Sequence, residues 1–241
     1  NVHRTGTLVR DQISHDAWRM LNALRIDARW RQPPRHGLAW PGLELLDDGI
    51  RVLNAFSGTE AENMTRNFAW RFLEMGRRIE RAVQLVELLG ALVPSAELPE
   101  RDGNLRLLLE LGDSFMTYRS RYLMTPLTAP VLDLLVLDES NPRGVAYQLK
   151  ELDGHLGMLP GDGPHRSPGQ RLLLKLLTAV RLAEVGELTH RDPDGTMPGL
   201  TKLLDELATG LPELSDIIAG AYFAHAEAPV VTMALRRREE P

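Results

Sequence analysis

Charged side chains are concentrated in residues 61–82, AENMTRNFAWRFLEMGRRIERA. From Phe72 onward, apolar or small residues recur there at alternating steps of four and three, which predicts one stripe of an amphipathic helix. At about 100° per residue, Glu80 falls at the edge of that stripe, and we expect its carboxylate to be at least half buried. A buried carboxylate requires a cation or several hydrogen-bond donors nearby. The spacing therefore predicts a polar pocket in which Glu80 orients Arg77 or Arg81 to hold a carboxylate or phosphate of a ligand.

The same charges have an ordinary structural interpretation. Glu74 and Arg78 are four residues apart, and Arg77 and Glu80 are three apart, so ion pairs along one helix can form without any ligand. Exposed pairs of this kind contribute only about 0.3–0.5 kcal/mol each, which is too little to explain so dense a pattern. A buried structural network and a ligand site therefore both stay open.

The candidate ligand-binding residues all carry a charged or amide side chain beside the predicted pocket or at a helix end. They are Asn63, Arg66, Arg71, Arg77, Glu80, Arg81, Arg119, Arg121, Asn141 and Arg143. Arg119 and Arg121 are predicted to supply counter-charges to Glu80 or Glu74, or else to stabilise the C-terminal end of their own helix. Asn141 and Arg143 precede a predicted helix, where they suit contact with an anion, or where Asn141 is simply the helix cap.

Two residues are candidates for acid or base catalysis. They are Glu80 and His225, which closes the run AYFAH near the end of the last long predicted helix. A histidine satisfied by a neighbouring carbonyl is the ordinary alternative for His225. The sequence contains no P-loop, nucleophile elbow, dinucleotide-binding turn or HExxH motif, and the loop at 190–195 lacks the acids of an EF-hand. We therefore predict no metal site and no cofactor in this chain.

Helical periodicity predicts an all-α protein, a single compact bundle of about seven to nine helices that forms one domain over residues 1–241. The predicted helices cover about 7–31, 41–56, 60–91, 102–125, 130–137, 141–158, 167–189 and 198–226, with a break near Pro212 as an alternative for the last. Residues 159–166 and 190–198 are predicted to be mobile loops, and 227–241 a tail. Gly76 and Gly90, placed on the inward stripe, predict close packing of another helix there.

Composition limits the possible functions. The formal net charge of −5 argues against a protein that mainly grips the nucleic-acid backbone. No apolar run approaches the roughly 18 residues that a membrane span needs, so we expect no membrane partner and a cytoplasmic location. The absence of cysteine removes disulfides, thiolate metal sites and cysteine nucleophiles.

The sequence resembles the alpha-E family, an all-helical bacterial domain named for a Glu-Arg motif, here Gly76-Arg77-Arg78-Ile79-Glu80-Arg81-Ala82. Further segments similar to this family are distributed along nearly the whole chain. They are Val9-Arg10-Asp11-Gln12 with Ser14, Trp18 and Asn22; Phe56-Ser57-Gly58; Glu62-Asn63-Met64-Thr65-Arg66; Trp70-Arg71-Phe72; Tyr118-Arg119 to Thr125-Pro126; Leu137-Asp138-Glu139 with Asn141-Pro142-Arg143; and Tyr222-Phe223-Ala224-His225.

The resemblance implies a partner as well as a fold. Similar sequences are often fused to, or encoded beside, a circularly permuted ATP-grasp domain, with transglutaminase-like proteins as further neighbours. That context implies ATP-dependent formation of peptide or amide bonds, with ATP and Mg²⁺ bound by the ATP-grasp domain and not by this one. Family members usually begin with another helix carrying an earlier copy of the motif. This chain starts at Asn1-Val2-His3 without that helix, so it looks like the C-terminal part of a longer polypeptide.

Three hypotheses for function follow. The first is a non-catalytic helical accessory domain that binds a peptide-like substrate or docks on an ATP-grasp amide ligase through the helix from Asn63 to Arg81. The second is an enzyme in its own right, with Glu80 or His225 as acid or base. The third is a structural module for oligomerisation.

Overall fold

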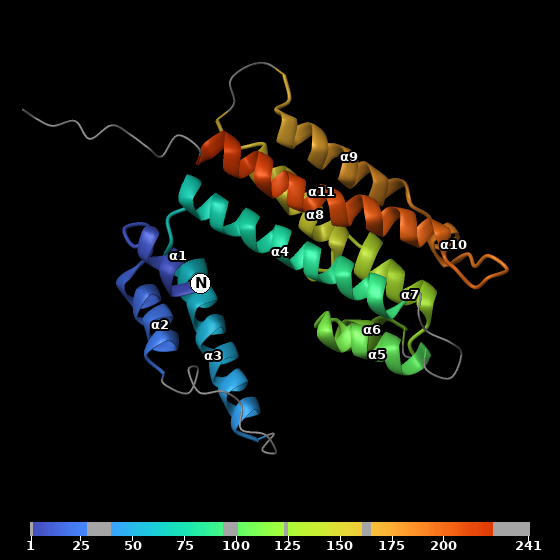
Figure 1. Cartoon of the computed structure of the whole chain (residues 1–241), viewed down its shortest axis with the longest axis horizontal. Helices are drawn as coiled ribbons and strands as arrows, with labels where there is room; N and C mark the ends of the chain where they lie inside the picture. Colours follow the sequence, from blue (N-terminus) through green and yellow to red (C-terminus); the bar gives the residue numbers. More distant parts are fainter. Residues whose placement is uncertain (1, 28–39, 94–100, 123–124, 161–164, 224–241) are drawn as a thin grey trace, which may run out of the picture. The chain divides into compact units, whose positions relative to one another are not determined.

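The computed structural model describes residues 2–27, 40–93, 101–122, 125–160 and 165–223. Over these ranges it contains eleven α-helices, nine of them at least seven residues long, one π-helical turn and no strand (Figure 1). The all-α prediction is confirmed. The chain divides into two compact units, Asn1–Leu73 and Glu74–Pro241. None of the described helices combines the length and the apolarity needed to cross a bilayer.

The first unit contains α1 (Val2–Leu8), α2 (His15–Ile26) and α3 (Trp40–Asn63), and α2 packs against both of the others. The single helix predicted over 7–31 is wrong, because the chain turns between α1 and α2. The hydroxyl of Ser14 accepts a hydrogen bond at 3.1 Å from a backbone N–H in the first turn of α2, which makes Ser14 its N-cap.

Helix α3 runs further than the sequence indicated. It continues through Gly58, where a stop was predicted, and ends at Asn63. A glycine inside a helix costs only about 1 kcal/mol relative to alanine, so it weakens the helix without ending it. The next helix, α4 (Phe68–Leu92), starts eight residues later than predicted, after Asn67 accepts a hydrogen bond from the backbone N–H of Trp70 at 3.2 Å.

The second unit begins within α4 and contains all the later elements. They are α5 (Arg101–Leu111), α6 (Phe115–Tyr122), α7 (Thr128–Leu132), the π-helical turn η2 (Asp133–Leu137), α8 (Val145–Leu156), α9 (Pro168–Leu182), α10 (Val185–Thr189) and α11 (Pro198–Tyr222). Helix α9 packs against both α8 and α11 (Figure 1), and leucines from these three helices are buried in the core. Helix α11 continues through Pro212 without a break.

Two helix boundaries in this unit shape the candidate site. The helix predicted over 102–125 is interrupted after Leu111, where Asp113 takes the left-handed backbone conformation with φ +48°. Helix α8 starts at Val145, and Gly144 is its N-cap. A Cβ on Gly144 would lie 3.1–3.3 Å from three carbonyl oxygens of the η2 region, so a larger residue would require these oxygens to shift by a few tenths of an ångström.

The buried face of α4 is rotated relative to the predicted one. Its fully buried residues are Met75, Ile79, Ala82, Leu85, Val86 and Leu89. Gly76 and Gly90 are both exposed, and a Cβ on Gly76 would meet nothing within 4 Å. The close helix packing predicted at Gly76 is therefore wrong, while a Cβ on Gly90 would reach ordinary contact, 4.0 Å from Leu204 of α11.

The loop after α10 is held by its own hydrogen bonds. The N–H of Asp192 donates to the carbonyl of Thr196 at 3.0 Å, and Gly195, at φ +84°, donates back to Asp192 at 2.8 Å. The mobility of 190–198 stays a prediction, as does the single domain over 1–241. The predicted tail at 227–241 and residues 161–164 of the other predicted loop lie outside the described residues.

Candidate functional site

The buried carboxylate of the motif helix belongs to Glu74. This residue is 7% exposed, and its two oxygens are taken by different arginines. Nη1 of Arg77 lies 2.5 Å from Oε1, and Nη2 of Arg78 lies 3.0 Å from Oε2. The predicted Glu74–Arg78 pair of the structural interpretation is therefore confirmed, and both arginines come from the same helix as the buried acid.

Glu80 is exposed, which contradicts the predicted embedded carboxylate. The buried stripe of α4 is centred near Ala82 and Leu89, and at about 100° per residue Glu80 lies roughly 165° from its middle, on the solvent side. Its side chain forms no hydrogen bond or ion pair with the described part of the chain. Arg77 pairs with Glu74 and not with Glu80.

Arg78 connects α4 to the loop that precedes α8. Its Nη1 donates to Oε1 of Gln148 at 3.4 Å, and its guanidinium lies 5.4 Å from the ring centroid of Tyr147. Gln148 is completely buried, and its Nε2 donates to the carbonyl of Pro142 at 2.7 Å. A continuous polar network therefore runs from Glu74 through Arg78 and Gln148 to the loop.

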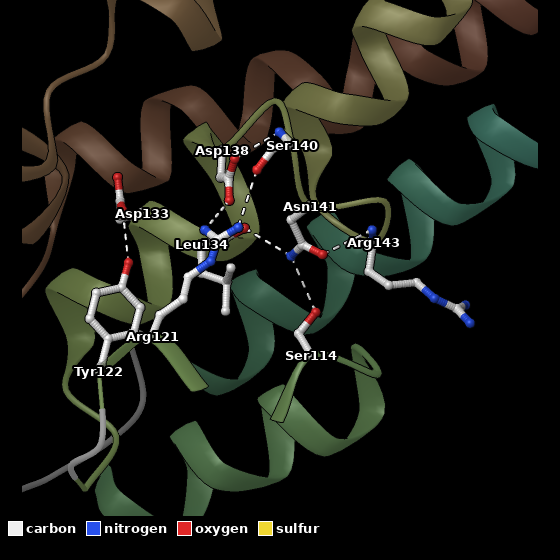
Figure 2. Close-up of polar contacts among 9 residues, drawn as sticks. All are labelled: Ser114, Arg121, Tyr122, Asp133, Leu134, Asp138, Ser140, Asn141 and Arg143. Atoms are coloured by element: carbon white, nitrogen blue, oxygen red, sulfur yellow. Dashed lines mark hydrogen bonds and ion pairs between the residues drawn. The ribbon is translucent and has the colours of Figure 1, made fainter. Parts of the chain in front are cut away.

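Asn141 fixes the other side of the same loop, as Figure 2 shows. It is 2% exposed, and its Nδ2 donates to the carbonyl of Leu134 at 3.0 Å and to Oγ of Ser114 at 3.2 Å. Its Oδ1 accepts from the backbone N–H of Arg143 at 3.2 Å. The prediction that Asn141 caps the next helix is wrong, because α8 begins four residues later. Its amide is bonded within the protein and is not presented to a ligand.

Arg121 and Arg119 do not reach the motif helix acids. Arg121 is hydrogen-bonded to the carboxylate of Asp138 and donates to Oγ of Ser140 at 3.1 Å (Figure 2). Arg119 is exposed, and its guanidinium lies 6.0 Å from the ring centroid of Phe115. The predicted counter-charges to Glu74 or Glu80 are therefore wrong, since both acceptors of Glu74 are taken by arginines of its own helix.

The Arg121–Asp138 pair makes stability depend on pH. Burial alone would raise the pKa of Asp138, but hydrogen bonds from Ser140 and Arg121 outweigh it and hold that pKa below its ordinary value. The stabilisation is therefore present above the unfolded pKa of about 3.9 and is lost as pH falls through the folded pKa. We expect Arg121→Gln to lower the free energy of unfolding by about 1 kcal/mol at pH 7, since the arginine is partly exposed.

Urea unfolding between pH 7 and pH 2.5 checks this expectation. The difference between wild type and Arg121→Gln should shrink as pH falls below about 4, because the pair loses its negative member. Arg119→Gln is the matched control and should show no such trend. A difference that stays constant down to pH 2.5 would mean that the pair does not stabilise the fold through charge.

Two guanidinium groups face a small recess in the second unit. The recess has a volume of about 80 Å³ and is lined by Arg81, Gln84, Leu85, Leu88, Leu111, Gly112 and Arg143. Nη2 of Arg143 lies 2.5 Å from Oδ2 of Asp113, which is itself 70% exposed. Arg81 is half-buried and makes no hydrogen bond or ion pair with the described residues.

The surroundings of Arg81 disfavour its positive charge. Burial is the largest cause that lowers the pKa of Arg81, followed by the positive charges of Arg143, Arg78 and Arg77. The carboxylate of Glu74 acts in the opposite direction but does not outweigh them. Arg81 therefore stays a cation in an environment short of negative charge.

The remaining candidates separate from this cluster. Asn63, Arg66 and Arg71 belong to the first unit. Arg66 donates to the carbonyls of Ala61 at 2.5 Å and Met64 at 3.3 Å and lies 4.5 Å from the ring centroid of Trp70, which indicates a structural role. His225 lies outside the described residues, so its role as a base stays a prediction. Among the residues that are described, no three His, Asp or Glu side chains gather as a metal site requires.

Sequence analysis missed several members of the network. Glu74 was recognised only as half of a local pair, and the roles of Gln148, Ser114 and Asp113 were not predicted. The signal for Glu74 was its position four residues before Arg78 and three before Arg77, which lets one carboxylate bond two arginines. Gln148 and Ser114 carry no comparable local signal, because their partners are distant in sequence.

Comparison with known families gives one match that covers most of the chain. A family model described as a predicted alpha-helical domain with a conserved ER motif matches residues 1–223. The Glu-Arg pair at 80–81, on which the resemblance was based, consists of one exposed acid and one half-buried arginine on α4.

Similar proteins are known from mycobacteria. Uncharacterised proteins of Mycobacterium bovis and of two strains of Mycobacterium tuberculosis are 28% identical to this chain over 220 residues. The match covers 90% of this chain and 25% of each relative, so the chain spans about a quarter of the length of these relatives. No solved structure matches the chain.

Proposed function

Since the chain belongs to the alpha-E family, we propose that it is a non-catalytic helical accessory domain of an ATP-grasp-type amide or peptide ligase system. In that role it binds a carboxylate of a peptide-like substrate at Arg81 and Arg143. One observation carries the binding site: Arg81 is half-buried among like charges, without an acidic partner in the described chain, at the wall of a recess. The ATP-grasp partner rests on the resemblance of the Glu-Arg motif and its context.

The charge around the recess favours an anion. Four guanidinium groups, of Arg77, Arg78, Arg81 and Arg143, surround the carboxylates of Glu74 and Asp113. This local excess of positive charge lies in a chain whose net charge is −5. An oxyanion between Arg81 and Arg143 would offset the mutual repulsion of the guanidinium groups, and their planar donor forks suit a carboxylate or a phosphate.

The size of the recess limits what it can hold. Its volume of about 80 Å³ is small, so we expect a single terminal carboxylate or phosphate to be the part of a ligand that enters it. Leu85, Leu88 and Leu111 contribute apolar walls, which strengthen the attraction of a bound anion by lowering the local dielectric constant. A chain-terminal carboxylate is the group that a peptide-like substrate would insert.

The network fixes Arg143 in place. Asn141 accepts from the backbone N–H of Arg143, and Gln148 donates to the carbonyl of the preceding Pro142. The backbone at Arg143 is therefore held from two directions before any ligand arrives. Such pre-organisation reduces the entropy lost on binding.

Calorimetric titration with N-acetyl-alanyl-alanine and with its C-terminal amide tests the site. We expect the free acid to bind and the amide to bind at least about tenfold more weakly, since the amide lacks the charge that pairs with arginine. Arg81→Gln should remove the difference between the two peptides without lowering stability, because Arg81 stabilises no described partner. Arg106→Gln is the matched control, as Arg106 is exposed and pairs with Glu110 at 2.9 Å.

A second variant tests the direction of the effect. Asp113→Asn removes the carboxylate that competes for Arg143, and asparagine tolerates the left-handed backbone at this position. Binding of the acid should tighten by a few fold. Equal binding of acid and amide, or unchanged binding in Arg81→Gln, would contradict the site, and tighter binding of inorganic phosphate than of the peptide would reassign its ligand.

The ligase context has its own test. In a reaction with an ATP-grasp protein from the same genome, ATP and Mg²⁺, addition of this chain should increase amide product, and Arg81→Gln should lose that increase. The chain alone should release no ADP. ADP release by the isolated chain would favour an enzyme in its own right, for which exposed Glu80 offers no support. A transglutaminase-like protein is a further partner to assay in the same reaction.

A further inference from the structure

We propose that a polar pocket in the first unit binds the primary ammonium group of a small ligand. The pocket has a volume of about 300 Å³ and is formed by the turn before α2, the last turn of α3 and the turn before α4. It lies wholly within residues 11–67, so this inference does not depend on the oxyanion recess.

The lining of the pocket is rich in hydrogen-bond acceptors. Eight of its ten lining residues are polar, two of them carboxylates, and none is a cation. Glu60 is 3% exposed, whereas Asp11 is exposed at the rim. An ammonium group has three donors and no acceptor, so it matches a wall of carboxylate, amide and hydroxyl oxygens.

Several of these acceptors are available to a ligand. Nε2 of Gln12 donates to Oδ2 of Asp11 at 2.9 Å. Oδ1 of Asp11 and Oε1 of Gln12 can therefore still accept hydrogen bonds from a ligand. The side chains of Asn63 and Thr65 form no hydrogen bond with the described residues. In contrast, Oδ1 of Asn67 already accepts a hydrogen bond from the backbone N–H of Trp70, so Asn67 lines the pocket without offering this oxygen to a ligand.

The nearest arginines in sequence do not line the pocket. Arg10 donates to the carbonyl of Ile13 at 3.3 Å and lies 5.4 Å from the ring centroid of Trp18. Arg66 donates to the backbone carbonyls of Ala61 and Met64 and is not among the lining residues. The ten lining residues therefore include two carboxylates and no cation, which favours a cation over a neutral ligand.

An organic ammonium fits better than a divalent metal ion. Mg²⁺ and Ca²⁺ take six or more oxygen ligands and prefer several carboxylates, whereas this lining offers two. A pocket of about 300 Å³ also exceeds the space that a single ion occupies and fits a small amine with its attached groups.

The test is an NMR titration of the chain with L-alaninamide at pH 6, where the amine is protonated, since α-amino groups titrate near 7.7–8.0. We expect shifts confined to residues 11–14 and 59–67. N-acetyl-L-alaninamide, which has the same shape without the cation, should leave them unchanged. Asp11→Asn and Asn63→Ala should each weaken binding about fivefold or more, and Glu62→Gln, which is exposed outside the lining, should not.

Three outcomes would overturn the inference. The first is that millimolar alaninamide shifts no NMR signal of residues 11–14 and 59–67. The second is that the N-acetylated probe shifts these signals equally. The third is that KCl or MgCl₂ causes the same shifts and prevents alaninamide from binding. Because Glu60 is buried, its substitution is a weaker test than those of the exposed Asp11 and Asn63, which leave the fold intact.

Discussion

Replacing Glu74 by glutamine is expected to lower the free energy of unfolding by about 3 kcal/mol or more, because it leaves two largely buried arginines without their carboxylate. The Arg77 and Arg78 side chains are 22% and 14% exposed, and each forms an ion pair with the carboxylate of Glu74. Glutamine keeps the shape of the side chain and one acceptor oxygen but removes the charge. Urea denaturation at pH 7 measures the loss.

The matched control lies on the same helix. Glu80→Gln removes one negative charge at an exposed position of the Glu-Arg motif. We expect the free energy of unfolding to change by no more than about 0.5 kcal/mol. If instead Glu80→Gln is the more damaging substitution, the assignment of Glu74 as the buried acid is wrong.

The contrast between Glu74 and Glu80 shows how far periodicity alone predicts a helix face. Two stripes on α4 satisfy alternating steps of four and three, and both contain Ile79 and Val86. The predicted one also runs through Phe72, Gly76, Val83 and Gly90, and the buried one through Met75, Ala82 and Leu89. The predicted stripe includes two glycines, which have no side chain to bury. The buried stripe has larger apolar side chains at the corresponding positions, including Leu89 and Val93. Side-chain volume would have selected the correct face, and with it the correct acid.

Helix content was predictable, but helix interruptions were less so. Local signals for them exist, such as Ser14 as a cap and Gly112 before a left-handed Asp113. Each signal lies inside a sequence whose apolar spacing also suits a continuous helix, and tertiary packing decides between the two. Gly58 and Pro212 show the reverse case. Glycine and proline disfavour helix interiors, yet α3 continues through Gly58 and α11 through Pro212.

The candidate site was predictable in composition and not in geometry. In the structure Arg77 and Arg81 lie in one charged cluster with Arg143, a candidate that was predicted separately, in the loop before a helix. Arg121, Arg66 and Asn141 instead serve the fold. No local pattern distinguishes Arg121 from Arg143, because their partners, Asp138 and Asp113, are distant in sequence and are brought near by tertiary packing.

Asn141→Ala is the second substitution with a large expected effect, a loss of about 2–3 kcal/mol in the free energy of unfolding, because buried groups lose their hydrogen-bond partners. The carbonyl of Leu134 and the N–H of Arg143 would each lose a bond at a position that is 2% exposed. Asn104→Ala, a half-buried asparagine on α5, is the control and should change stability by less than about 0.5 kcal/mol.

A charged isostere at the same position separates donation from acceptance. In Asn141→Asp, the carboxylate can still accept from the N–H of Arg143 but cannot donate to Leu134 or Ser114, and it places a negative charge against a carbonyl oxygen. Burial should raise the folded pKa of the new carboxyl group above its unfolded value near 3.9, so the loss should be greatest at pH 7 and shrink as pH falls toward 4. Unfolding of Asn141→Asp and Asn141→Ala across this range measures the effect. A loss for the aspartate variant that does not change with pH would mean that the buried negative charge is not its cause.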